Sequence, residues 1–163
     1  MKVKESDWHI KHLDIFKNNY FKAKYFNTVF PIISELYRTI DSEFLSDINQ
    51  FLIKEICNLL NIRTTFRRSS EFYNNSSEKM TPTDRLLDIC IQTNCKIYIS
   101  GELAKNYLDI EKFSSKNIKV FWFDYKLSKE YKQFQKDFMG NLSIIDCVMH
   151  SNFEGNQFLN TMN

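Results

Sequence analysis

Two short segments with the composition of buried strands flank a segment with the composition of a helix. The strand-like segments are KIYIS at 96–100 and IKVFWFDYK at 118–126, with GELAKNYLD at 101–109 and the connection EKFSSKN at 111–117 between them. A strand, a helix and a second strand joined by short links form a βαβ unit, which predicts parallel pairing and a right-handed crossover. This unit places the chain in the α/β class.

The chain before this unit has the pattern of packed helices. Apolar residues recur every three or four positions in the segments 8–20, 23–39 and 42–60, which predicts three helices with one buried face each. Asn61 is a favourable stop for the third helix, and Pro31 predicts a kink or a restart within the second. The N-terminal half is therefore expected to be helical.

Three further segments complete the predicted fold. IRTTFRR at 62–68 predicts a short strand, DRLLDICIQTN at 84–94 predicts a helix capped by Thr83, and a last helix is expected to begin after Ser143. The fold class is α/β, with a helical N-terminal half followed by a small parallel βαβ sheet that is Rossmann-like but incomplete. So small a sheet exposes its edges, so either strands are missing from this chain or another chain supplies them.

Length and composition predict one folded domain. The chain has 163 residues, of which 43% are hydrophobic and 26% charged, which is the balance of a globular protein. We therefore expect a single domain over 1–163, with a mobile polar loop at 69–83 and a frayed tail at 152–163. A net charge of +2 gives no general field for nucleic acid or an anionic membrane, so neither is an expected partner.

The cysteines and the N-terminal sequence bear on the cellular compartment. The chain has four cysteines without CxxC spacing, and three of them stand within apolar segments, as reduced thiols do. No charged-then-apolar leader is present, and no apolar run approaches the ~18 residues of a membrane span. A cytoplasmic protein without a membrane span is expected.

Ser100 and Gly101 stand where the first strand of the unit is expected to run into the helix. In open parallel sheets, ligands bind beyond the carboxyl ends of the strands, where helix N-termini offer unpaired backbone amides. Gly101 permits a sharp turn and a close backbone approach, and Ser100 offers a hydroxyl to a ligand. The alternative is an ordinary turn in which Ser100 only caps the next helix.

The order of motifs along the chain gives this turn a context. WHIKHLDIFKNNYFKAKYF stands near the start, and DRLLDIC, IYISGELAKNYLD, NIKVFWFDYK, EYKQFQKDF and NLSIIDCVM follow. This order resembles the WbqC-like family, found among bacterial genes for surface polysaccharide synthesis. YISG followed by YLD is the most specific piece of the resemblance, which extends to about residue 150.

The chain also departs from the family's pattern. Members usually begin with a segment containing His-Gln-Pro-x-Tyr-x-Pro, and this sequence has none. The chain is therefore expected to be an N-terminally truncated domain, equivalent to the C-terminal two-thirds of the family. Lys132 and Gly140 stand where the family has proline, and His150 and Asn152 stand where it favours Asn and Gly.

The resemblance implies a set of site residues. Its strongest matches are Ser100, Gly101, Tyr107 and Asp109, and its second candidates are Arg85, His12, Asn141, Ser143 and Asp146. Within this set Asp109 and Asp146 are the implied catalytic residues, and the others are implied to bind substrate.

The residues themselves leave alternatives open. Tyr107 can lean over the Ser-Gly turn or be buried under the sheet. Asp109 is expected at the end of a helix, where a carboxylate opposes the dipole, which is a mild hint of function. Arg85 can instead pair with a neighbouring aspartate of its own helix, and Asp146 can be either a partly buried acid or an exposed residue.

Several kinds of site lack their sequence signature. His9 and His12 form an i, i+3 pair that binds zinc only with a third ligand, and no cysteine or carboxylate is spaced to supply it, so no metal site is expected. The sequence has no GxGxxG, Walker loop, GxSxG elbow or HExxH, so it identifies no cofactor.

Two main interpretations of function remain, together with a weaker third. The first is an enzyme or enzyme fragment, of the transferase type, that acts on an activated sugar or on an acyl or aminoacyl donor in O-antigen or capsule synthesis. The second is a non-catalytic binding or scaffold subunit, homo-oligomeric or paired with another chain that completes its sheet. The third is a nucleotidyltransferase-like fold.

Overall fold

The computed structural model describes residues 1–73, 80–123 and 130–154, and the chain divides into two compact units. Unit 1 comprises Met1–Thr64 and Ser128–Asn163, and unit 2 comprises Thr65–Leu127. Each unit has a hydrophobic core of its own. The two units are described separately.

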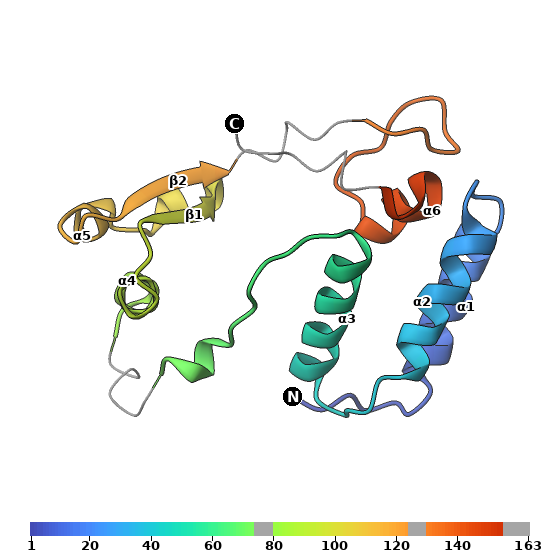
Figure 1. Ribbon diagram of the computed structural model, residues 1–163, viewed down its shortest axis with the longest axis horizontal. Helices are drawn as coiled ribbons and strands as arrows, with labels where there is room; N and C mark the ends of the chain where they lie inside the picture. The colour runs from blue at the N-terminus through green and yellow to red at the C-terminus, as the bar shows by residue number, and fades with distance from the viewer. Residues whose placement is uncertain (74–79, 124–129, 155–163) are drawn as a thin grey trace. The chain divides into compact units, whose positions relative to one another are not determined.

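Unit 1 is a cluster of helices. It contains α1 (Trp8–Tyr20), α2 (Phe26–Arg38), α3 (Leu45–Leu59) and α6 (Ile144–Ser151), drawn in blue, teal and red in Figure 1. The helix predicted at 8–20 is thus present with the same bounds, and those predicted at 23–39 and 42–60 are present with slightly shorter ones. Because α6 follows the others only after unit 2, the chain returns to unit 1 to complete it.

The core of unit 1 forms where α6 packs against α2. Val29 and Ile33 of α2 and Val148 and Met149 of α6 are at most 1% exposed. The backbone N–H of Tyr25 donates to the carbonyl of Met149 at 3.1 Å, which ties the start of α2 to α6. Burial of these aliphatic side chains is the main force that holds α6 in place.

Unit 2 contains the predicted βαβ sheet. β1 (Ile97–Gly101) and β2 (Lys119–Phe123) pair in parallel, with Ile97 opposite Lys119 and Gly101 opposite Phe123. One face of this sheet packs on α4 (Pro82–Gln92) and α5 (Ile110–Ser114) through an apolar core, whose buried members are Leu87, Cys90, Leu108, Phe113 and Ile118. The predicted α/β class, with a helical N-terminal half and a small parallel sheet, is confirmed.

The other face of the sheet carries apolar side chains that remain exposed. Ile97, Ile99 and Phe121 alternate with the residues that face the core, and their exposed fractions are 55%, 44% and 48%. A strand with one buried and one open face has this period of two. The open face is unusual because it is apolar rather than polar.

The crossover between the strands differs from the expected single helix. Residues 101–109 contain a 3₁₀ helix, Glu102–Asn106, and the α-helix of the crossover is α5, which begins at Ile110 and overlaps the predicted connection 111–117. Asp109 causes this shift, because its side chain accepts a hydrogen bond from the backbone N–H of Lys112 at 3.3 Å and so begins a new helix.

Two other expectations about elements are wrong. The residues at 62–68 form no strand, because no neighbouring strand pairs with them in the described parts of the chain. Thr81, not Thr83, caps α4: its hydroxyl accepts from the backbone N–H of Asp84 at 3.2 Å, and Pro82 occupies the first helical position, which proline favours.

Parts of three expected segments lie outside the described residues. They are 74–79 of the loop predicted at 69–83, 124–126 of the second predicted strand, and 155–163 of the tail predicted at 152–163. Within the loop, Ser69–Glu71 forms a 3₁₀ turn, and within the tail Phe153 packs against the core of unit 1. No helix in the described ranges is long and apolar enough to cross a bilayer.

Candidate functional site

The Ser-Gly turn at the end of β1 has ordinary strand geometry. Gly101 has φ −71° and ψ 156°, so the expectation that it makes a sharp, glycine-specific turn is wrong. Ser100 lies within β1, opposite Trp122, and it does not cap the following 3₁₀ helix, whose cap position is Gly101. The Ser100 hydroxyl contacts Tyr98, whose pKa is raised chiefly by burial while this hydrogen bond opposes the rise.

Tyr107 and Asp109 follow that turn and are fixed by Thr83. The Thr83 hydroxyl donates to the Tyr107 carbonyl at 3.3 Å and accepts from the Asp109 backbone N–H at 3.4 Å. The side chain of Tyr107 is 58% exposed, so the alternative of a tyrosine buried under the sheet is wrong. Asp109 begins α5 rather than ending a helix, so its carboxylate is favourable there and the expected conflict with the dipole is absent.

Arg85 is exposed on α4, and each of the two aspartates of its helix contacts a residue other than Arg85. Asp84 forms an ion pair with Lys112 at 2.6 Å, and this hydrogen bond is the main reason that the pKa of Asp84 is lowered. Asp88 accepts a hydrogen bond from Gln92 at 2.6 Å. The α4 aspartates therefore serve mainly to hold local structure in unit 2.

Asp146 is the most deeply buried of the candidate acids. It lies on α6 in unit 1 with 5% of its surface exposed, so of the two alternatives for Asp146 the buried one is correct. Its Oδ2 accepts hydrogen bonds from the Tyr131 hydroxyl at 2.8 Å and from Gln133 Nε2 at 2.9 Å. A buried carboxylate needs such donors, and these two come from the irregular segment that precedes α6.

His150 lies one turn further along α6 and completes the polar cluster. Its side chain is 5% exposed, and Nδ1 lies 3.7 Å from Asp146 Oδ1 and 2.9 Å from the main-chain oxygen of Asp146. Because a carbonyl oxygen can only accept, Nδ1 carries the hydrogen in this contact. His150 Nε2 is buried and has no hydrogen-bond partner among the described residues.

Aromatic rings enclose this cluster. Tyr20, Tyr131 and Phe134 stand around the His150 ring, with centroids at 6.1, 6.4 and 4.6 Å. Burial is the largest cause of the raised pKa of Tyr131, and it raises the pKa of Tyr20 to about 12, with the charge of Asp146 adding to both shifts. We name Asp146, His150, Tyr131, Gln133 and Tyr20 the Asp146 centre.

The C-terminal end of α6 has a second unusual feature next to this centre. Asn152 has φ 61° and ψ −169°, a backbone conformation that is almost confined to glycine. Its side-chain Oδ1 is buried without a hydrogen-bond partner among the described residues, as is His150 Nε2.

His12 and Ser143 lie together in unit 1. Both line an apolar pocket of about 320 Å³ between α1, α2, α3 and the start of α6, where Phe16 and Ile145 supply apolar wall. His12 Nδ1 lies 3.5 Å from the Tyr37 hydroxyl, and Ser143 caps α6 by accepting from the backbone N–H of Ile145 at 3.3 Å. Asn141 is an exposed turn residue with φ 59°, so it, rather than Gly140, makes the turn before α6.

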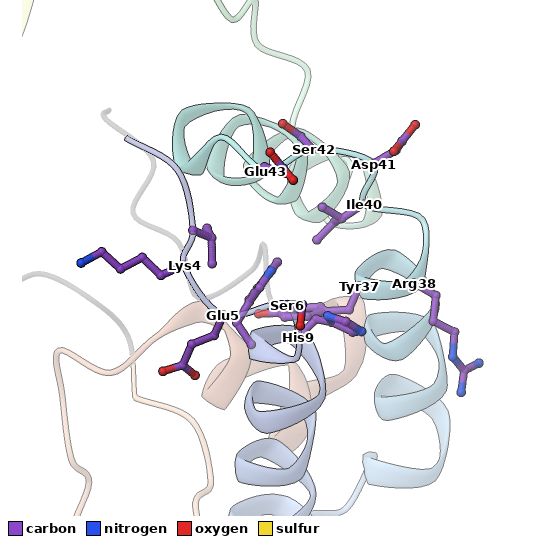
Figure 2. A pocket seen from close by; sticks show the side chains of 12 residues that line it. Lys4, Glu5, Ser6, His9, Tyr37, Arg38, Ile40, Asp41, Ser42 and Glu43 are labelled. Atoms are coloured by element: carbon purple, nitrogen blue, oxygen red, sulfur yellow. The ribbon is translucent and has the colours of Figure 1, made fainter.

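A larger pocket, of about 490 Å³, lies at the start of α1 and was not expected from the sequence. One wall is the N-terminal segment, held by the antiparallel bridge between Lys2 and Phe44. Figure 2 shows Ile40 pointing into the hollow, while Lys4, Arg38 and Asp41 point away from it. These three charged side chains therefore face solvent rather than a common ligand position.

The predicted site residues fall into two groups. Unit 2 holds Ser100, Gly101, Tyr107, Asp109 and Arg85, and unit 1 holds His12, Asn141, Ser143 and Asp146. Sequence reasoning did not assign His150, Tyr131, Gln133 or Tyr20 to a site, although the spacing of Asp146 and His150 by one helical turn was a usable signal. No group of three metal-ligating side chains occurs within the described part of the chain.

These features define a small α/β protein with a buried carboxylate–imidazole centre. The chain belongs to the WbqC-like protein family, which matches residues 1–157. It is also 30% identical over 154 residues to the uncharacterized protein Rv1507c of Mycobacterium tuberculosis. That match covers 94% of this chain but only 65% of the relative's length, and no solved structure gives a significant match.

Proposed function

We propose that this WbqC-like protein is a transferase of bacterial surface polysaccharide synthesis that takes a group from an activated sugar or from an acyl or aminoacyl donor. The observation that carries the proposal is the Asp146 centre. A carboxylate that is buried beside an imidazole, with both groups held by hydrogen bonds, is the arrangement that orients a general base.

The roles within this centre follow from the contacts. Asp146 is the positioning residue, because Tyr131 and Gln133 fix its carboxylate and Asp146 in turn stands beside His150 Nδ1. The imidazole is the group with a free nitrogen, and a free Nε2 can accept a proton from an acceptor hydroxyl or amine. The aromatic rings exclude water and so strengthen the electrostatic interactions inside.

The remaining predicted residues have separate roles in the proposal. His12 and Ser143 line an apolar pocket of unit 1 that suits the acyl portion of a donor better than a nucleotide sugar. Ser100, Gly101 and Tyr107 form a separate candidate surface for a polar ligand on unit 2. Asp109 and Arg85 support that unit, and Asn141 shapes the turn before α6.

The test is a thermal-shift screen of the full chain with nucleotide sugars, acyl-coenzyme A donors, acyl phosphates and aminoacyl donors, because a ligand that binds only the native state raises the melting temperature. We expect one donor class to raise it, and we expect Asp146→Asn to lose the transfer of the group to an acceptor. Asp137→Asn, an exposed aspartate of the same unit, is the matched control. Donor transfer that persists in Asp146→Asn, or no response to any donor, would refute the proposal.

A second function is favoured by the open face of the sheet. Ile97, Ile99 and Phe121 form an exposed apolar surface, which suits a scaffold subunit that packs this face of its sheet against another chain. This alternative predicts a dimer or a larger assembly in size-exclusion chromatography with light scattering. We expect Ile99→Thr with Phe121→Thr to dissociate it, and a monomer at every concentration tested would contradict a homo-oligomer.

A further inference from the structure

The C-terminal end of α6 holds two polar atoms that are buried without partners. They are His150 Nε2 and Asn152 Oδ1, two positions apart at the end of one helix, and neither has a hydrogen-bond partner among the described residues. Leaving a buried polar atom unpaired is unfavourable, so native structures seldom do so without an occupant such as a water or a ligand. The end of α6 therefore points to a bound group.

The chemistry of that group follows from what the two atoms can do. His150 Nδ1 donates to the Asp146 carbonyl, so Nε2 of the neutral ring has a lone pair and accepts. Asn152 Oδ1 also accepts. The missing partner must therefore donate hydrogen bonds, and a group that satisfies both atoms must donate at least two.

The charges around these atoms favour a cation. Asp146 supplies a carboxylate whose Oδ1 lies 3.7 Å from the His150 ring, and the C-terminal end of a helix carries partial negative charge. The rings of Tyr20, Tyr131 and Phe134 surround His150 and shield these charges from water, which strengthens their attraction for a cation. A carboxylate would have no hydrogen to donate, and a carboxylate or a phosphate would be repelled by Asp146.

The backbone of Asn152 gives independent support. Its φ of 61° with ψ −169° is costly for any residue other than glycine, and such outliers cluster at ligand-binding positions. An asparagine there contributes an amide oxygen that a glycine cannot provide. Binding of a ligand therefore explains the presence of the Asn152 side chain, which the stability of the local backbone does not explain.

We propose that the end of α6 binds a primary amine, whose N–H groups donate to His150 Nε2 and Asn152 Oδ1. The amine reaches the site when the ring of Phe134 moves aside. That ring lies edge-on to His150 at 4.6 Å, belongs to a segment without helix or strand, and is 53% exposed. The inference deepens the proposed function, on which it rests for the transfer step, since it makes the acceptor of the group an amine.

Binding is tested without any donor. The full chain is titrated with glucosamine, with glucose and with N-acetylglucosamine at about pH 8, where an ordinary imidazole is neutral. A second arm uses ethylamine against ethanol. The readouts are the melting temperature and the ¹⁵N chemical shift of the His150 ring.

We expect the amine-bearing probe of a pair to bind at least about tenfold more tightly than its partner, as the loss of one buried charged hydrogen bond would give. Glucosamine alone would identify an amino sugar, whereas ethylamine at similar affinity would identify a simple amine or an amino-acid side chain. Equal binding of glucosamine and glucose together with equal binding of ethylamine and ethanol would overturn the inference.

Two variants distinguish a loss of amine binding from a loss of protein stability. Asn152→Gly relieves the backbone and removes Oδ1, so we expect an unchanged or higher melting temperature with about tenfold weaker amine binding. His150→Asn keeps a donor for the Asp146 carbonyl and removes Nε2, with the same expected loss. Ser34→Ala, which removes the buried unpaired hydroxyl of α2, is the control and is expected to leave amine binding unchanged. Amine binding that survives both variants would overturn the inference.

The inference and the proposed function fail in different ways. Amine binding without transfer from any donor class would refute the transferase and leave the amine site standing. Transfer to a hydroxyl acceptor, with no preference for amines, would refute the amine site and leave the transferase standing.

Discussion

Removal of the Asp146 carboxylate should destabilise unit 1 by an amount that the structure allows us to work out. In Asp146→Ala, the Tyr131 hydroxyl and Gln133 Nε2 lose the oxygen to which both donate, at 2.8 and 2.9 Å. A hydrogen bond to a charged group contributes about 1.5–3 kcal/mol, so two independent bonds would contribute roughly 3–6 kcal/mol.

Two effects reduce this sum. Gln133 Nε2 keeps its bond to the Met139 carbonyl at 3.0 Å, and the variant no longer buries a carboxylate, whose desolvation is unfavourable. The two bonds also share one acceptor atom, so their contributions are not additive. We therefore expect Asp146→Ala to lower the free energy of unfolding by about 3 kcal/mol.

The assay needs to follow unit 1 alone, and the two tryptophans make this possible. Trp8 lies in unit 1 and Trp122 in unit 2, so a Trp122→Phe background reports the unfolding of unit 1 by fluorescence. With a urea m-value of about 1–3 kcal/mol/M, a loss of about 3 kcal/mol lowers the midpoint by roughly 1–3 M.

The matched control is Asp137→Ala in the same background, because Asp137 is exposed. It should change the free energy of unfolding by less than about 0.5 kcal/mol. Asp146→Ala with an equally small effect would refute the reasoning, since it would mean that the network does not hold the irregular segment against α6.

Other predictions concern titration, reactivity and capping. Burial raises the pKa of Tyr20 from 10.0 to about 12, so the native state holds this proton more tightly than the unfolded chain does. The stability that this provides is complete below about pH 10 and is lost as the pH rises toward 12. Tyr20→Phe should therefore make the urea midpoint fall less steeply with pH in the alkaline range, and an unchanged slope would contradict this. Burial also raises the pKa of the Cys90 thiol to about 12, so in mass-spectrometric alkylation Cys90 should react more slowly than the half-buried Cys57; equal rates would show that Cys90 is accessible. Thr81→Ala should lower the free energy of unfolding of unit 2 by about 1 kcal/mol, because α4 loses its cap. Thr83→Val should lower it by about 1–2 kcal/mol, because the backbone N–H of Asp109 loses its acceptor. Both changes are measured by the fluorescence of Trp122 in a Trp8→Phe background, and an unchanged stability in Thr83→Val would contradict the tie between α4 and the crossover.

The elements that the sequence predicted well are those with a long apolar period or a direct capping signal. The helices of unit 1 have enough turns for the period to be counted, and β1 and β2 follow from a strand-like composition on either side of a short crossover. Asn61 ends α3 with φ 56°, as expected. The rule that an asparagine can end a helix also applies to Asn94 and Asn117, which follow α4 and α5 and have positive φ. None of the described glycines has a positive φ.

The misses have a common physical cause. α5 has five residues, too few for a period, and only the cap at Asp109 marks its start. The strand predicted at 62–68 had the right residue types but no neighbour with which to pair, and pairing is not a local property. Tyr131 and Gln133 contact Asp146 from an irregular segment, so no periodicity in the sequence predicts these contacts.

The positions where local preference is violated support the choice of site. In unit 2, Thr81 and Asp109 stand at helix starts, where each residue type is favoured. In unit 1, the short helix α6 carries a buried acid at Asp146 and an imidazole with an unpaired nitrogen at His150, and it ends at Asn152 in a glycine conformation. Each of these is unfavourable alone, and a sequence keeps such conflicts where a ligand or a reaction compensates for them. Their concentration within two turns of one helix supports the proposal that the end of α6, rather than the Ser-Gly turn of unit 2, is where the chemistry occurs.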